Sequence, residues 1–201
     1  MVLLYEDPRK KMTQPKTMIY PIPSHKAVYF RVPKVASTSL LLALRKVDPA
    51  DKSDEYDKSH FKFTFVRNPF DRLASCYRHV IRRGTPEVLD GCPGMSRTMS
   101  FETFVEALSK IEKPEKMDMH FRPQYTFFPE KPDYIGKFEN LKEDFAEICQ
   151  KIGLHPPELL HRNSTDKTIF KDYYRDSKIL QKVVNCYKKD FEMFGYSKEG
   201  M

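Results

Sequence analysis

The chain has 201 residues, of which 40% are hydrophobic and 13% aromatic, enough for one sizeable core and short for two independent domains. Charged residues make up 31%, with 35 Lys and Arg against 28 Asp and Glu, so the net charge is +7. This mixed-sign, aromatic-rich composition excludes a disordered polyampholyte, and the absence of a long apolar run excludes a membrane-spanning helix. The basic excess suits an anionic partner, which could be a phosphorylated cofactor, an acidic glycan or a nucleic acid.

The cysteines indicate a reducing compartment. All four are far apart in the sequence, without a C-x-x-C pair or a histidine at metal-ligand spacing. A disulfide framework and a zinc site are therefore both disfavoured.

The first residues form neither a basic n-region nor a full apolar h-region, so no secretory signal is predicted. We expect free thiols, no bound metal and a cytoplasmic location.

The amino-terminal part of the chain predicts an arm followed by a strand and a helix. Residues 1–25 contain four prolines, which preclude a long helix, and we expect an arm lying over the surface of a single domain at 26–201. The β-branched and aromatic run at 27–32 predicts a strand. Apolar residues at helical spacing over 40–47 predict a helix that ends at Asp48.

A second strand and helix follow. The run at 61–66 predicts a strand, and Asn68 with Pro69 is typical of a helix cap with proline at the first helical position. The helical pattern ends at Gly84. Glycines and prolines then recur through 84–100, where we expect a loop.

The remaining pattern again alternates helices and strands. We expect a helix at 101–111, a strand at 133–138, a helix capped by Asn140 and ending at Gly153, and a last helix at 176–189. Strands that alternate with helices favour an α/β fold with a mainly parallel sheet.

The first candidate site is the loop between the first strand and its helix. Loop amides and first-turn N–H groups have no helical partner, and the helix dipole attracts anions there. Lys34 adds a positive charge, and Ser37, Thr38 and Ser39 add hydroxyl donors. Small side chains at Ala36 and Ser37 take the place of the glycines of a phosphate-binding loop. An ordinary capped helix with a solvated Lys34 fits the same residues equally well.

The second candidate site follows the next strand. Arg67 stands at that strand's carboxyl end, where ligands bind in open α/β sheets, and its guanidinium can fork onto a phosphate. Ser75 lies about two helical turns further on, off the line of Leu73 and Tyr77. Taken singly, an ion pair for Arg67 and a solvated Ser75 are the simpler interpretations.

Together the two motifs resemble those of the carbohydrate sulfotransferases that use 3′-phosphoadenosine 5′-phosphosulfate (PAPS), in the branch of the 2-O and chondroitin/HNK-1-type enzymes. The segment at 33–39 is similar to the family's 5′-phosphosulfate loop, and 67–77 is similar to its 3′-phosphate motif. Further likeness lies at 118–124, 133–141 and 187–196. The resemblance covers about residues 27–196. It implies a P-loop-like three-layer sandwich with a small, mainly parallel central sheet flanked by helices.

The resemblance also implies the cofactor and its contacts. PAPS would donate its sulfonyl group to an acceptor hydroxyl by in-line displacement, without a metal because Lys and Arg replace the cation. Lys34 would also stabilise the leaving phosphate oxygen, which makes it a catalytic residue. Arg67 and Ser75 would bind the 3′-phosphate. The residues implied to bind the 5′-phosphosulfate are Lys34, Val35, Ala36, Ser37, Thr38 and Ser39.

The general base is the least defined residue. His120 resembles the family's recurrent histidine, and histidine suits proton abstraction near neutral pH. His60 is the alternative, with Asp54 and Glu55 as further candidates, and a purely structural His120 is equally compatible with the sequence.

The acceptor is expected to be a saccharide hydroxyl, positioned by Arg122 and Gln124 beside His120. Its identity stays open, because some relatives carry substrate-binding groups in the stretch that is short here, residues 35–66. Animal enzymes of this type have a membrane anchor and lumenal disulfides, and the sequence shows no pattern for either, so we expect a compact, anchor-free form.

Two other functions compete with sulfate transfer. A P-loop kinase would need two glycines in the first loop and a Mg²⁺-binding Asp after a strand. A non-catalytic anion- or nucleic-acid-binding protein also fits the charge. However, basic residues are dispersed among acidic ones and no short binding motif occurs, so we expect no nucleic acid partner.

Overall fold

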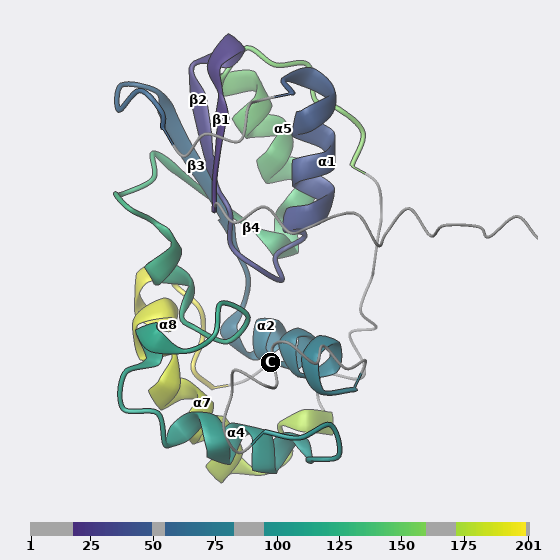
Figure 1. The fold of residues 1–201 in the computed structure, drawn as a ribbon, viewed down its shortest axis with the longest axis vertical. Coiled ribbons are helices and arrows are strands. Elements are labelled where there is room, and N and C mark those ends of the chain that lie inside the picture. Colours follow the sequence, from purple (N-terminus) through teal and green to yellow (C-terminus); the bar gives the residue numbers. More distant parts are fainter. Residues whose placement is uncertain (1–17, 50–54, 83–94, 160–171, 200–201) are drawn as a thin grey trace, which may run out of the picture.

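The computed structural model describes residues 18–49, 55–82, 95–159 and 172–199. Its sheet occupies one half of the molecule and a group of helices occupies the other (Figure 1). The four strands stand in the order β1-β2-β3-β4. They are β1 (Ile19–Ile22), β2 (Ala27–Phe30), β3 (Phe61–Val66) and β4 (Tyr134–Lys137).

The sheet is mostly parallel, which confirms the predicted α/β class. β2 pairs in parallel with β3, and β3 pairs in parallel with β4. All residues of β2 are buried, as expected of a central strand in a mainly parallel sheet. Because parallel strands end at one edge, the segments that follow Phe30 and Val66 leave the sheet side by side.

β1 corrects the prediction that residues 1–25 form a surface arm. Residues 19–22 pair antiparallel with β2, after which a 3-10 turn at Pro23–His25 and a left-handed Lys26 reverse the chain. Pro21 is tolerated because β1 is an edge strand, where one side of the backbone needs no partner. The prolines exclude a helix here but not an edge strand. Residues 1–17 lie outside the described residues.

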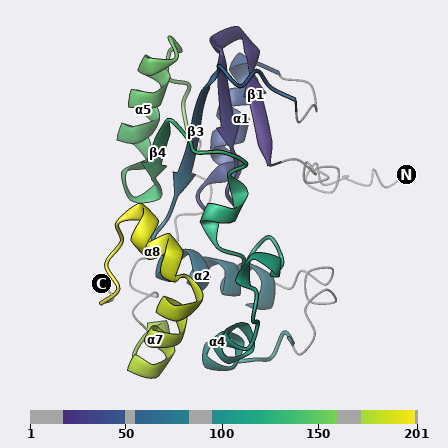
Figure 2. The same cartoon turned by 90° about the vertical axis from the view of Figure 1, so that its left-hand side faces the viewer.

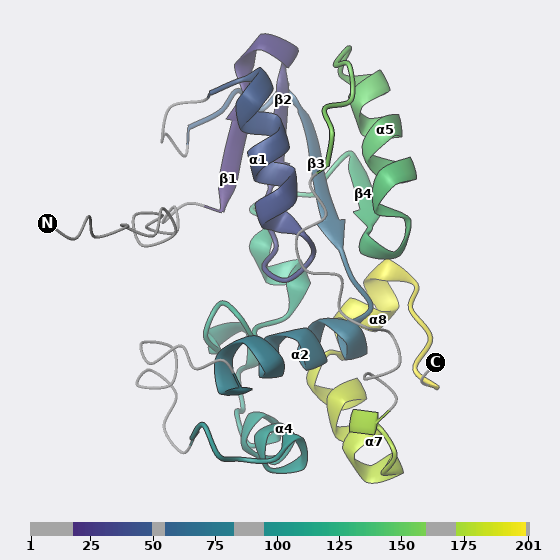
Figure 3. The ribbon, with the colours of Figure 1, turned by 90° about the vertical axis from the view of Figure 1, so that its right-hand side faces the viewer.

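Two helices cover one face of the sheet. α1 (Ser37–Val47) and α5 (Leu141–Lys151) lie in front of the strands in Figure 3. Their apolar side chains and the inward side chains of the strands form one hydrophobic cluster, which includes Tyr29, Leu40, Leu44, Phe63, Phe65, Phe145 and Ile148. Gly136 lets β4 approach Phe65, whose ring would lie 2.5 Å from a Cβ at that position.

The ends of these two helices match the sequence in part. α1 ends before Asp48, and α5 is followed by Gly153 with a left-handed φ of 68°, both as predicted. Asn140 precedes α5 but makes no side-chain cap, because a 3-10 turn at Phe138–Asn140 already leads into the helix. The predicted capping role of Asn140 is therefore wrong.

The other helices pack around a second hydrophobic cluster beyond the carboxyl ends of the strands (Figures 1 and 2). Asn68 caps the first of them, accepting the Phe70 N–H at 2.9 Å, with Pro69 at the first helical position as predicted. A π-helical turn at Arg78–Arg82 continues this helix. The helices are α2 (Pro69–Tyr77), α4 (Phe101–Ser109), α7 (Ser177–Cys186) and α8 (Lys188–Phe194). Gly84 and most of the predicted loop after it lie outside the described residues.

The predicted helix at 176–189 is two helices. Tyr187 separates α7 from α8 with φ of −115° and ψ of 23°. Its side chain is buried and its hydroxyl donates to the Phe121 carbonyl at 2.6 Å. The apolar pattern runs through Tyr187 without interruption, so the break is set by this long-range contact.

Candidate active site

The Lys34 loop has an unusual backbone. Lys34 and Ala36 adopt left-handed φ values of 72° and 61°, a conformation that costs a non-glycine residue about 1–2 kcal/mol. Ala36 occupies the N-cap position of α1 and provides no side-chain cap. The helix α1 thus begins at the sheet edge, and its first-turn N–H groups lack the side-chain cap that a Ser or Thr would give.

The side chains of this loop divide into anchors and exposed groups. Val35 is fully buried in the cluster beneath α1, and Ser39 is also buried. Ser37 is half-buried, Thr38 is exposed and Lys34 is half-buried. Val35 can therefore offer an anion only its backbone, whereas Lys34, Ser37 and Thr38 retain accessible side chains.

Arg67 joins the two candidate motifs. It follows β3 directly, is only 7% exposed and stacks its guanidinium over the Phe138 ring at 4.1 Å. Its Nη1 donates to the Lys34 carbonyl at 3.4 Å, so the predicted proximity of the two motifs is present. Burial lowers the pKa of Arg67. Within the described part of the chain its Nε has no hydrogen-bond partner, which leaves a buried donor at the sheet edge.

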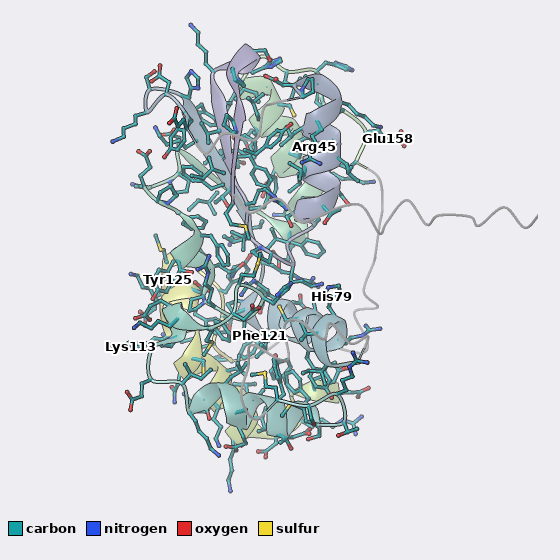
Figure 4. The ribbon with its side chains drawn as sticks, in the orientation of Figure 1. Arg45, His79, Lys113, Phe121, Tyr125 and Glu158 are labelled. Atoms are coloured by element: carbon teal, nitrogen blue, oxygen red, sulfur yellow. The ribbon has the colours of Figure 1, made fainter. Side chains whose placement is uncertain are left out.

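Ser75 lies further along α2. It is half-buried and shares a helix face with Asp71 and His79, since the three residues are spaced by four. Figure 4 shows His79 in the helical half, within the π-helical turn that continues α2. The rise of the helix places Ser75 roughly 9 Å beyond Pro69 along the α2 axis. Its role as a phosphate ligand stays a prediction.

His120 is held in one orientation by Asp118. The two side chains meet with 2.7 Å between His120 Nδ1 and Asp118 Oδ1, and the same oxygen accepts the His120 backbone N–H at 2.9 Å. Burial raises the pKa of Asp118, but these bonds outweigh it and hold that pKa below its usual value. An ionised Asp118 accepts the Nδ1–H, which leaves the lone pair on Nε2. This orientation suits a base.

His60, the alternative base, lies at the opposite end of β3 from Arg67. It precedes the first residue of β3, whereas Arg67 follows the last, and a six-residue strand spans about 20 Å. Its Nε2 lies 4.0 Å from Asp57 Oδ2. This separation from Arg67 disfavours His60, whose role stays a prediction. Glu55 is exposed in the segment before β3, and Asp54 lies outside the described residues.

The two residues expected to position an acceptor differ in how accessible their side chains are. Arg122 is half-buried and stacks over the Phe127 ring at 4.2 Å. Gln124 is fully buried, and its amide bonds the Arg67 backbone on both sides, accepting from N–H at 2.9 Å and donating to C=O at 2.8 Å. Since both ends of the Gln124 amide are occupied, its expected contact with an acceptor is wrong.

Sequence reasoning missed Arg72, which ties the two loops together. It is 2% exposed, and its Nε donates to the Pro33 carbonyl at 3.0 Å. Its Nη1 and Nη2 donate to the carbonyls of Arg122 at 3.1 Å and His120 at 3.4 Å. Its position in the sequence could have indicated burial, because Arg72 shares a helix face with Pro69, Cys76 and other buried residues of α2.

The resulting arrangement suits a polyanionic ligand next to an oriented imidazole. Lys34 and Arg67 stand at the carboxyl edge of the sheet beside the uncapped start of α1. The Asp118–His120 pair is fixed to the same edge through Arg72. The described residues contain no group of three or more His, Cys, Asp or Glu side chains arranged to hold a metal ion. In the same ranges, no helix has both the length and the apolar character needed to cross a bilayer.

Known proteins resemble the chain over most of its length. The model of the sulfotransferase family matches residues 41–197, which include Arg67, Ser75 and His120 and begin just after the Lys34 loop. Carbohydrate sulfotransferase 14 of Danio rerio is 28% identical over 224 residues, covering 86% of this chain and 60% of the relative. Carbohydrate sulfotransferase 12 of Xenopus laevis is 30% identical over 174 residues, covering 70% and 41%. Carbohydrate sulfotransferase 9 of Homo sapiens is 25% identical over 185 residues, covering 77% and 42%.

The chain spans about half the length of these relatives. No solved structure matches it. The similarities give no support to the cytoplasmic location expected from the sequence. They do agree with the resemblance drawn from its motifs, and because the family match runs from residue 41 to residue 197, the chain belongs to the sulfotransferase family.

Proposed function

We propose that this protein transfers the sulfonyl group of PAPS to a hydroxyl of a saccharide. The observation that carries the proposal is the contact of Arg67 with the Lys34 carbonyl, which brings two anion-binding motifs to one sheet edge. The Asp118–His120 pair, tied to that edge by Arg72, supplies an oriented base.

The donor would lie across this edge. Lys34, the hydroxyls of Ser37 and Thr38, and the backbone from Val35 to the buried Ser39 would bind the 5′-phosphosulfate at the start of α1. Arg67 and Ser75 would bind the 3′-phosphate. Two features support this fit: the unpartnered buried Nε of Arg67 and the strained backbone of Ala36, which exposes the α1 N–H groups.

The chemistry divides between two residues. The bound donor supplies a sulfonyl group attached to a phosphate that can leave. As the acceptor oxygen bonds to sulfur and the bond from sulfur to the phosphate oxygen breaks, negative charge grows on that oxygen, where Lys34 stabilises it. His120 Nε2 takes the proton of the acceptor hydroxyl, and Asp118 stabilises the imidazolium that forms. Lys34 and Arg67 would supply the positive charge that many phosphoryl-transfer sites obtain from a metal ion.

A saccharide acceptor is supported by the relatives, which are named carbohydrate sulfotransferases. Arg122 extends the positive charge beside His120, which would favour an acidic saccharide. The kinase alternative lacks its requirements, because the Lys34 loop contains no glycine and the residue that follows β3 is Arg67 rather than an aspartate.

The proposal is tested by calorimetry with two nucleotides, adenosine 3′,5′-bisphosphate and adenosine 5′-phosphate, which differ only in the 3′-phosphate. A charge-assisted hydrogen bond contributes about 1.5–3 kcal/mol, so Arg67→Ala should weaken the bisphosphate by about 10- to 150-fold and the monophosphate far less. The matched control is Arg175→Ala, because the Arg175 side chain is 78% exposed. Labelled PAPS with a panel of neutral and acidic saccharides then identifies the acceptor. Equal losses for the two nucleotides, or no binding of the bisphosphate, would refute the proposal.

A further inference from the structure

Asp190 is a fully buried carboxylate that the proposed reaction does not use. It lies on α8, and both of its oxygens accept backbone N–H groups from one distant turn. Oδ2 accepts the Gln124 N–H at 2.8 Å and Oδ1 accepts the Tyr125 N–H at 3.0 Å. The carboxylate thereby fixes the start of the 3-10 turn at Gln124–Phe127.

Gln124 passes this constraint on to Arg67. The last paired residues of β3 and β4 are Val66 and Lys137, so Arg67 lies just beyond the ladder, without a strand neighbour in register. The Gln124 side chain takes the neighbour's place by bonding both the N–H and the C=O of Arg67. Two backbone bonds at one residue fix the direction of its Cα–Cβ bond, and hence where the guanidinium can reach.

A gain in folding stability does not by itself explain why a carboxylate is buried at position 190. A buried charge loses its hydration, and well-packed apolar groups of similar size are often as stable or more so. Burial raises the pKa of Asp190, whereas the hydrogen bonds from Gln124 and Tyr125 and the positive charge of Arg72 oppose that shift. Buried groups of this kind are used where geometry has to be exact to a fraction of an ångström.

We propose that Asp190 is a positioning residue for Arg67: it acts through Gln124 and sets the affinity for the 3′-phosphate of the donor. The inference rests on the proposed function, since it assumes that Arg67 binds that phosphate. It assigns a role to the segment at 187–196, whose likeness to the sulfotransferases was recognised in the sequence without one.

The variant that tests it is Asp190→Asn. An asparagine offers one accepting oxygen, while its NH₂ group faces a second backbone N–H, so one of the two bonds is lost with no change of shape. We expect the affinity for adenosine 3′,5′-bisphosphate to fall about tenfold, which is typical when a residue that orients a binding side chain is changed. The affinity for adenosine 5′-phosphate should change less than about twofold. If Asp190→Asn fails to fold, Gln124→Met provides a second test. Methionine has a similar length but no amide, so we expect the same selective loss of bisphosphate affinity.

The matched control is Asp176→Asn. Asp176 also accepts a backbone N–H, that of Lys178 at 2.8 Å, but it caps α7 and has no such link to Arg67. Neither nucleotide affinity should change in this variant. In the Arg67→Ala background, Asp190→Asn should cause no further loss of bisphosphate affinity, because its effect passes through the side chain already removed.

The outcomes separate the inference from the proposed function. Equal losses for both nucleotides, or additive losses in the double variant, would overturn the role of Asp190 while leaving the proposed function standing. A wild-type protein that binds the bisphosphate no more tightly than the monophosphate would overturn the proposed function and this inference together. A selective loss that vanishes in the Arg67→Ala background supports both.

Discussion

The Lys34 loop and the loop around His120 are built in different ways. The Lys34 loop takes much of its shape from consecutive residues: the left-handed Lys34 and Ala36, and the start of α1. Side chains from other elements bond only its Pro33 and Lys34 carbonyls among the contacts described above. The loop from Asp118 to Tyr125 is held mainly by side chains from other elements. Those side chains belong to Arg72, Tyr187 and Asp190. The first loop therefore depends more on its own backbone, whereas the second depends more on the packing of the helical half.

The variant His120→Ala is expected to have the largest effect and to separate turnover from donor binding. The proposed function assigns donor binding to the Lys34 loop and to Arg67, so affinity for adenosine 3′,5′-bisphosphate should persist. Turnover should fall about 10²- to 10⁴-fold, the usual effect of a lost general base, and the acidic limb of the pH–rate profile should disappear. Steady-state rates from pH 5 to 9 and calorimetry measure the two effects separately.

His60→Ala is the control for this experiment, because His60 lies at the amino end of β3 and should leave turnover unchanged. If His120→Ala keeps near-normal turnover, the Asp118–His120 pair is only structural and the catalytic assignment is wrong.

Arg72 is the residue through which the two loops can be uncoupled. Arg72→Ala leaves the carbonyls of Pro33 and Arg122 without this donor, while the His120 carbonyl keeps the Cys76 thiol at 2.7 Å. The change also opens space in the core, so we expect a loss of about 3 kcal/mol in the free energy of unfolding. Urea unfolding at 25 °C measures it. Arg72→Lys keeps the charge but not the fork of donors and should give an intermediate loss.

The exposed Arg175 again supplies the comparison, since Arg175→Ala should change stability by less than about 0.5 kcal/mol. A loss under about 1 kcal/mol for Arg72→Ala would mean that water replaces the guanidinium, and that the loops are not joined through it.

The same contrast explains what could be predicted from the sequence. β3 and the Asn68 cap follow from adjacent residues and were predicted correctly. The break at Tyr187 was missed because its hydroxyl bonds a carbonyl 66 positions away, which leaves no trace in the local apolar pattern. β1 was missed for a related reason: its proline-containing residues become a strand only by pairing with β2.

The candidate site divides in the same way. Lys34 and Arg67 could be proposed as anion-binding residues from the sequence, because each lies between a predicted strand and the helix that follows it. Gln124 and Arg72 act on residues 57 and 48 positions away, and their types alone gave no indication of partners. Asp190 was noticed only within a segment that resembles the family.

The smallest expected effect tests whether the Lys34 loop is truly a local structure. Ala36→Gly should raise the free energy of unfolding by about 0.5–1 kcal/mol: the left-handed conformation costs alanine about 1–2 kcal/mol, and glycine's greater freedom in the unfolded chain takes back part of this gain. The matched control is Ala43→Gly, the same change in the interior of α1, which should destabilise by about 1 kcal/mol or more. Opposite signs for two identical substitutions, one at the N-cap and one in the interior of the same helix, would place the strain in the backbone of residue 36. If Ala36→Gly destabilises like Ala43→Gly, contacts of the methyl group outweigh the strain, and this loop too is shaped by its neighbours. Bisphosphate affinity measured on the same variant then separates the two views: a loop defined by its own backbone keeps its ligand when the strained alanine becomes glycine.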